Sequence, residues 1–287
     1  MISSKKLWQL PLSLICLAGS YNMVSATPRI LYGKMDVFMK ADGYGRYVWK
    51  DGSAYEGLWK DGKKEGHGRY DYSSEDESGK LTYSGFWIND KQEGNGKLKW
   101  KDGSIYDGDF KNGVREGDGT QNYANGDVYV GKWHKDVREG TGKFISKQWN
   151  YVYEGHFKNG QRSPDGYGIL TYYNGDTYKG DFKNNLMEGK GTYTWTNGNK
   201  YVGDFLSNNF QGYGVLTFSS GNVYKGYLKN SKFEGQGTYT YANGNEYIGS
   251  WLNDRKHGYG QKTYKNGTVE AGQWENGKFL GSIELKI

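Results

Sequence analysis

The sequence predicts an all-β protein, an elongated single-layer stack of antiparallel β-hairpins that forms a repeat solenoid. Three observations lead to this fold class: a Tyr-x-Gly element recurs every 23 to 25 residues, an Asp-Gly or Asn-Gly pair closes most units, and apolar residues alternate with polar ones between them. A repeat period of this length is typical of stacks whose units bury their apolar faces on their neighbours. With 46 glycines in 287 residues, no window offers a competing helical stripe.

The repeat array is expected over residues 55–281, preceded at 27–54 by a segment that includes a half-repeat cap and followed at 282–287 by a cap strand. A degraded last unit within the array contains Trp274. The nine tyrosines that begin complete units are Tyr55, Tyr83, Tyr106, Tyr129, Tyr153, Tyr178, Tyr201, Tyr224 and Tyr247. The glycines two residues after them are Gly57, Gly85, Gly108, Gly131, Gly155, Gly180, Gly203, Gly226 and Gly249.

Two short strands are expected in each unit. In the stretch 191–195, aromatic residues alternate with threonine, which places one set on a buried face and the other in solvent. Turns such as Asp51-Gly52 and Asn125-Gly126 supply the positive φ values that tight hairpins need. We expect the glycine after each tyrosine, and both glycines of the Gly-x-Gly elements, to lie where aromatic side chains approach the backbone.

These motifs resemble the MORN (membrane occupation and recognition nexus) repeat, a Tyr-x-Gly-x-Trp/Phe stretch followed by Gly-x-Gly. The stretches at 83–87, 106–113 and 247–251 are close to its consensus, and the resemblance covers about residues 43 to 281. It implies stacked β-hairpins in one elongated, twisted sheet, used as a scaffold or a membrane-proximal targeting module. The sequence departs from the pattern at 148–150, at Ser163-Pro164 and at 73–80.

The first 26 residues have the pattern of a secretory signal peptide. Lys5 and Lys6 precede an apolar stretch, and small residues up to Ala26 suit cleavage there. An uncleaved anchor and a lipoprotein signal are the alternatives. Cleavage removes Cys16, the only cysteine, and an exported chain without disulfides fits a bacterial periplasm or cell surface. The expected location is therefore secreted or in the cell envelope.

Basic residues recur at the end of the first strand of most units. Removal of Lys5 and Lys6 with the signal peptide lowers the formal net charge from +6 to about +4, which is too small for strong nucleic-acid binding unless it is concentrated on one face, so no nucleic-acid partner is expected. A row of lysines could instead meet phospholipid head groups or an acidic partner, or it could consist of solvated turn lysines. Its members are Lys60, Lys111, His134, Lys158, Lys183 and Lys229.

An acidic residue stands before most Gly-x-Gly elements. In the C-terminal half these acids follow Met187, Phe210 and Phe233, which either project as an apolar patch for a protein partner or fold back over the sheet. The acidic row consists of Glu65, Glu93, Glu116, Glu139, Asp165, Glu188 and Glu234.

No catalytic, cofactor or metal site is expected, and the chain is predicted not to be an enzyme. The four histidines occupy different template positions, so stacking does not gather them into a ligand set or a base–nucleophile pair. The leading hypothesis is an exported scaffold that binds a protein partner. The alternative is a module for anionic phospholipid or envelope glycan, which would require aligned aromatics beside lysines on one open face. A cytosolic scaffold and a homodimer through the stack ends are further possibilities.

Overall fold

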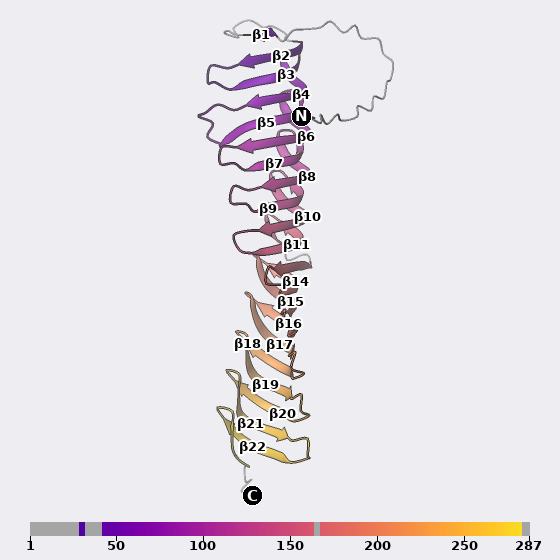
Figure 1. The fold of residues 1–287 in the computed structure, drawn as a ribbon, viewed down its shortest axis with the longest axis vertical. Helices are drawn as coiled ribbons and strands as arrows, with labels where there is room; N and C mark the ends of the chain where they lie inside the picture. Colours follow the sequence, from indigo (N-terminus) through magenta and orange to yellow (C-terminus); the bar gives the residue numbers. More distant parts are fainter. Residues whose placement is uncertain (1–28, 32–41, 164–166, 283–287) are drawn as a thin grey trace, which may run out of the picture.

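The computed structural model describes residues 29–31, 42–163 and 167–282. The expected signal peptide and all but the first residue of the expected C-terminal cap strand lie outside these ranges. In Figure 1 the described chain forms one long, twisted column of strands that runs from an indigo N-terminal end to a yellow C-terminal end. The described residues contain strands and turns but no helix, and accordingly none that could cross a bilayer. The all-β prediction is confirmed.

All the strands belong to one 23-stranded sheet. Their bounds are β1 (Arg29–Leu31), β2 (Gly43–Val48), β3 (Ala54–Lys60), β4 (Lys63–Asp71), β5 (Lys80–Ile88), β6 (Lys91–Trp100), β7 (Ile105–Lys111), β8 (Val114–Asn122), β9 (Val128–His134), β10 (Val137–Ser146), β11 (Tyr151–Lys158), β12 (Gln161–Arg162), β13 (Gly168–Tyr172), β14 (Thr177–Lys183), β15 (Leu186–Thr194), β16 (Lys200–Leu206), β17 (Asn209–Thr217), β18 (Val223–Lys229), β19 (Lys232–Thr240), β20 (Glu246–Leu252), β21 (Arg255–Thr263), β22 (Val269–Glu275) and β23 (Lys278–Gly281).

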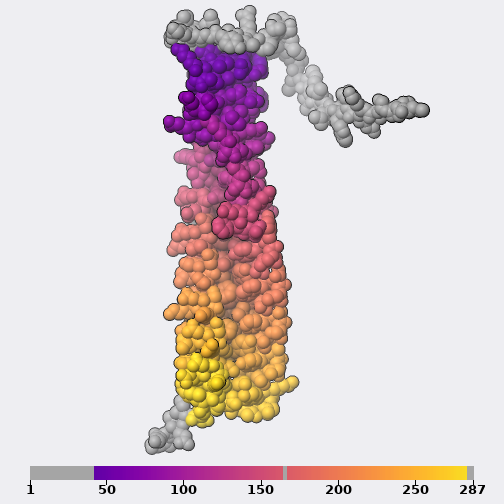
Figure 2. Space-filling model, turned by 60° about the vertical axis from the view of Figure 1, so that its left-hand side comes forward, coloured from indigo at the N-terminus to yellow at the C-terminus, as the bar shows by residue number. Residues whose placement is uncertain are grey.

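Strand pairing follows chain order, as two strands per unit require. From β2 to β11 and from β13 to β23 each strand is antiparallel to the next, while β1 is parallel to β2. The two extra residues near Ser163 interrupt the pattern, because β11 pairs with the short β12 and also with β13. Figure 2 shows the units following one another down a narrow column.

A single file of tyrosines forms the core. Each repeat tyrosine is fully buried and donates its hydroxyl hydrogen to the carbonyl oxygen three residues later, for example from Tyr106 to Asp109 at 3.0 Å. In most units its ring also makes edge contacts with an aromatic of its own unit and one of the next, but Leu228 takes the aromatic position in the unit of Tyr224. Tyr106 lies 5.2 Å from Phe110 and 5.4 Å from Trp133, measured between ring centroids. Aromatic contacts of the core tyrosines therefore cross the boundaries between successive complete units, except the one where Tyr201 meets the unit of Leu228.

Glycine is required at the repeat positions for two different physical reasons. A Cβ on Gly57 would lie 2.5 Å from the Tyr55 hydroxyl and 2.6 Å from the Cα of Gly68, so the aromatic approach is confirmed there and at the second glycine of Gly-x-Gly. For the first glycine of that element the expectation is wrong. Gly66 takes a φ of +64° and faces Leu58, not an aromatic ring. It is required for its left-handed backbone, at a point where the register between β3 and β4 shifts.

Candidate binding surface

The strands present two faces that differ in burial. In β3, Tyr55 and Trp59 are buried, whereas Glu56, Leu58 and Lys60 are exposed. We call the side of the repeat tyrosines the inner face and the opposite side the outer face. A binding surface must be formed by side chains that do not pack into the core.

In the described units with a Gly-x-Gly after a glycine bulge, the residue two positions before its first glycine covers the inner face. In the N-terminal half this residue is usually basic, and its charge lies over aromatic rings. The Arg115 guanidinium carbon is 4.2 Å from the centre of the Trp133 ring, and Lys64 Nζ is 4.7 Å from that of Tyr70. Burial lowers the pKa of Lys64. These cations act as lids on the core.

In the C-terminal half, Met187, Phe210 and Phe233 occupy this position in three units and fold back over the inner face. The fourth unit has Lys256, whose Nζ lies 4.8 Å from the centre of the Trp274 ring. Phe233 is 9% exposed and stacks on Tyr224 with 3.6 Å between centroids, and Phe210 stacks on Tyr201 at 4.0 Å. Met187 is buried as well. Of the two alternatives left open for these residues, folding back is therefore the one that the structure has, because the glycine bulge turns their side chains toward the tyrosines.

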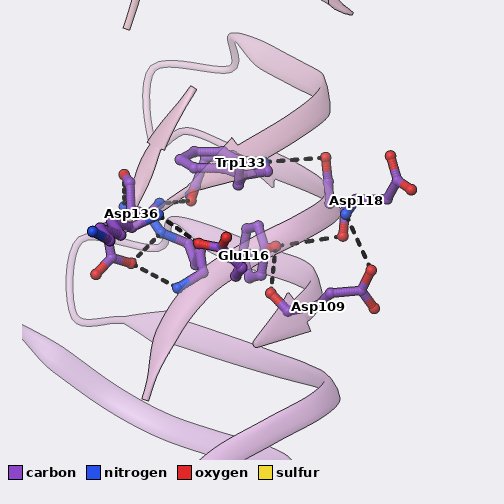
Figure 3. A network of polar contacts seen from close by, with 10 residues as sticks. Asp109, Glu116, Asp118, Trp133 and Asp136 are labelled. Carbon is purple, nitrogen blue, oxygen red and sulfur yellow. Dashed lines mark hydrogen bonds and ion pairs between the residues drawn. The ribbon is translucent and has the colours of Figure 1, made fainter. Parts of the chain in front are cut away.

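The acidic row has a structural role that the sequence reasoning missed. Glu116 accepts a hydrogen bond at 2.8 Å from the backbone N–H of Lys135, a turn residue in the following unit. That bond, and the one with His134, hold the pKa of Glu116 below its usual value. Figure 3 shows Glu116 within this polar network. The same bond links Glu65 to Asn89, Glu93 to Asn112, Glu139 to Asn159, Glu188 to Ser207 and Glu234 to Asn253, at 2.8 to 3.3 Å.

The glutamine that breaks this row supports the same interpretation. Gln211 uses its side-chain oxygen to accept from the backbone N–H of Asn230 at 3.2 Å. An uncharged acceptor can thus replace the carboxylate. A signal was present in the sequence, since a Glu or Gln at one template position always precedes a polar turn residue by about one unit. Asp165 lies outside the described residues.

The predicted lysine row is exposed, as expected, but it is not continuous. Lys60, Lys111, Lys183 and Lys229 end their strands with exposed side chains, and so does Lys158. The equivalent positions in other units are Ile88, Leu206, Leu252 and Glu275. His134 is paired with Glu116 at 2.9 Å. The role of this row as a ligand site stays a prediction.

The outer face contains two rows of side chains, one on each side of the central line of glycines. The first outer row begins with Arg46 and Glu56 and continues through residues that face each other on successive strands. In the N-terminal half it contains the ion pairs Lys97–Asp107 and Lys143–Glu154, both at 2.8 Å. From Ile169 to Ala271 its only charged members are lysines, Lys179 and Lys225.

The second outer row is formed by the middle residue of each Gly-x-Gly and the residue opposite it. Asp118 and Lys132 form an ion pair at 2.7 Å in the N-terminal half. At the equivalent positions in the C-terminal half, Tyr213 and Tyr227 face each other with centroids 5.6 Å apart, and they are 52% and 53% exposed. Other exposed tyrosines of this row are Tyr44, Tyr167 and Tyr259. The aromatic surface therefore belongs to a template position that the sequence reasoning did not single out.

An open groove of about 420 Å³ lies on the outer face across β14 to β17. Tyr167 and Tyr213 line it together with Lys179 and Lys190, and its lining includes backbone at Gly191, Gly203 and Gly214. Lys190 pairs with Asp204 at 2.5 Å. An open groove of this kind can hold a segment of a ligand, but it lacks the enclosure of a typical small-molecule site.

The described residues contain no group of three or more His, Cys, Asp or Glu side chains arranged to hold a metal ion. His67 contacts Phe86 edge to face, and His134 is occupied by its glutamate. The outer face thus offers contact surface and charge.

The fold and these surfaces define a repeat scaffold built from one open antiparallel sheet. The MORN repeat family matches ten segments, and the chain belongs to this family. The matched residues are 40–54, 55–77, 83–105, 106–128, 129–151, 153–177, 178–200, 201–223, 224–246 and 247–269. No curated protein matches the chain at a significant level.

Several solved structures share low similarity with the chain. One is the TCP10 domain of Danio rerio CPAP in complex with a STIL peptide, at 14% identity, 63% coverage of this chain, 80% of that chain and a TM-score of 0.41. Another is the Drosophila melanogaster SAS-4 TCP domain in complex with a proline-rich motif of Ana2. It is 15% identical, the match covers 63% of this chain and 85% of that chain, and the TM-score is 0.26.

Proposed function

We propose that this chain is an exported, non-catalytic MORN-repeat scaffold that binds a protein partner through the outer face of its sheet. The observation that carries the proposal is the run of exposed apolar side chains in the C-terminal half, which includes Val202, Tyr213, Tyr227 and Ile248. Interface centres are enriched in aromatic residues and depleted of charge. Val202 and Ile248 are aliphatic, and aliphatic side chains suit a protein surface better than a sugar ring or a head group.

Binding of a protein partner is tested with the chain from Thr27 onward and a double variant, Tyr213→Ser with Ile248→Ser. The wild type should capture a defined protein from the native envelope or secreted fraction, and the purified pair should bind again. The double variant should lose this binding. A matched control, Val130→Ser, removes an exposed aliphatic side chain from the N-terminal half and should bind normally. Equal binding by all three proteins would contradict the outer face as the contact surface.

Export is proposed from the pattern of residues 1–26 alone. The measurement is the N-terminal sequence of the protein purified from its native source. A start at Thr27 is expected, since cleavage after Ala26 leaves that residue first. A start at Met1 would favour an uncleaved anchor or the cytosolic scaffold.

A second candidate function is binding of anionic phospholipid or envelope glycan. The observation in its favour is that Tyr167 and Tyr213 lie beside Lys179 and Lys190 around the outer groove, which meets the requirement of aromatics beside lysines on an open face. Phosphatidylserine vesicles and an anionic polysaccharide gel are suitable probes. Binding that is lost in Lys179→Glu and in the combined Lys111→Glu, Lys158→Glu, Lys183→Glu and Lys229→Glu variant would support it. A homodimer through the stack ends is a separate proposal, which the molar mass in solution tests.

A further inference from the structure

The two halves of the rod differ in charge balance. Residues 42–163 contain 20 Lys or Arg and 20 Asp or Glu, whereas residues 167–282 contain 12 and 9. The excess positive charge therefore lies in the half with the aromatic outer surface. For binding, the important quantity is how much of this positive charge is neutralised by acidic side chains of the same half.

Most acids near the outer groove are already used by the fold. Asp204 pairs with Lys190, and Asp181 accepts the backbone N–H of Lys190 at 3.2 Å. Glu188 and Glu234 accept backbone N–H groups of the next unit. In the first outer row, Lys179 faces Ile169 and Thr192, and Lys225 faces Val215 and Thr238. Among the described residues of this half, that row supplies no acid opposite either lysine.

The N-terminal half supplies the contrast within the same molecule. At the positions equivalent to Val215 and Lys225, Lys97 faces Asp107 and Lys143 faces Glu154, and each of these pairs forms a salt bridge. Lys179 and Lys225 thus stand where the N-terminal half has an acid, and they face Ile169 and Val215 where that half has a lysine. The C-terminal half has the same type of base beside tyrosine and aliphatic side chains, without the opposing carboxylates. A partner that brings carboxylates would complete these pairs, as charge complementarity at interfaces requires.

We infer that the outer face of β13 to β21 binds an acidic, apolar-bearing polypeptide segment of the protein partner. This inference rests on the proposed function and specifies its site and partner chemistry. The carboxylates of the segment meet Lys179 and Lys225, while its apolar side chains pack on Tyr213, Tyr227 and Ile248. A polypeptide is favoured over a lipid bilayer because a narrow segment can reach the glycine-lined part of the groove, which a flat membrane surface cannot.

The test uses the chain from Thr27 onward and a displayed library of random short peptides. Selected peptides should be enriched in Asp or Glu together with aromatic or aliphatic residues, and their affinity should fall as salt is added. The pair Lys179→Glu and Lys225→Glu should weaken binding at least about tenfold. The pair Tyr213→Asp and Tyr227→Lys, which copies Asp118 and Lys132, should do the same.

The matched control is Lys97→Glu with Lys143→Glu, which reverses two exposed lysines of the same outer row and should leave peptide affinity unchanged. Selected peptides without acidic enrichment, or unaffected by Lys179→Glu and Lys225→Glu, would overturn the inference and leave the scaffold function standing. Loss of affinity in the control pair instead would place the site in the other half. Failure to select any peptide, with retention of phosphatidylserine vesicles or anionic polysaccharide, would overturn both this inference and protein binding as the proposed function.

Discussion

The two halves of the rod share every buried repeat tyrosine and differ at the positions that the repeat leaves free. In the N-terminal half, cations such as Arg115 cover the core and ion pairs such as Lys97–Asp107 cross the outer face. In the C-terminal half, Phe233 covers the core and Tyr213 stands exposed outside. The comparison shows that one template supports either a polar or an apolar surface. The fold is therefore encoded in the fixed positions, whereas the variable ones set the chemical character of the surface.

The largest expected effect comes from substitutions at the repeat glycines, which are closely packed in both halves. In Gly108→Val the Cβ would lie 2.4 Å from the Cα of Gly119, and in Gly226→Val it would lie 2.5 Å from that of Gly237. Both variants should lose about 3 kcal/mol of stability, because neither backbone can move away without breaking the ladder. Urea unfolding midpoints measure this loss. Gly79→Asn, where the space around the Cβ is open and asparagine tolerates the left-handed φ of +69°, is the control and should lose much less. Wild-type midpoints in both valine variants would contradict the close approach.

The apolar and the cationic residues that cover the core should contribute differently to stability. Phe233→Ala should cost about 3 kcal/mol, since it removes a buried ring that stacks on Tyr224. Arg115→Ala should cost about 1 to 2 kcal/mol, because it removes a cation–π contact and hydrogen bonds to Gln121 and Asp136 at the rim of the core. Thermal unfolding of the two variants gives the ranking. An unchanged Phe233→Ala protein would mean that this ring lies outside the core.

Alkaline pH should destabilise both halves alike. Burial raises the pKa of the repeat tyrosines, to about 12 for Tyr153 and Tyr247. The pKa of tyrosine in the unfolded chain is about 10. The stabilisation that comes from the raised pKa in the folded state is therefore complete below that pH and is lost as the pH rises through the folded pKa. The melting temperature should therefore fall from about pH 10 upward. In Tyr153→Phe the fall should be shallower, because one titrating phenol is absent. A flat profile would show that the phenols are accessible in the folded state.

The smallest effect concerns the outer ion pairs. Lys97→Gln should lower stability by about 0.5 kcal/mol, because both partners of the Lys97–Asp107 pair are about half exposed and water screens them. The difference from wild type should vanish in molar salt. A loss of stability as large as that of Phe233→Ala would mean that the outer rows support the fold. It would contradict the view that only the fixed positions of the repeat do so.

Much of the fold could be predicted from the sequence, because the stacking period, the buried tyrosines and the tight turns follow from local spacing. The direction of Met187, Phe210 and Phe233 could not, since the glycine bulge shifts the strand register just beside them. The role of the acidic row depends on contacts between successive units, which alternation within one unit does not reveal. The outer tyrosines had a readable signal, as Tyr44, Tyr167, Tyr213 and Tyr259 share one template position.

The most direct test of the central claim is the melting temperature of the double variant Tyr213→Asp and Tyr227→Lys. It transfers the Asp118–Lys132 pair of the N-terminal half to the equivalent outer positions of the C-terminal half. If variable outer positions carry binding and not stability, the melting temperature should stay within about 2 °C of wild type. A clear fall would contradict the account, because it would show that the exposed tyrosines are part of what holds the rod together.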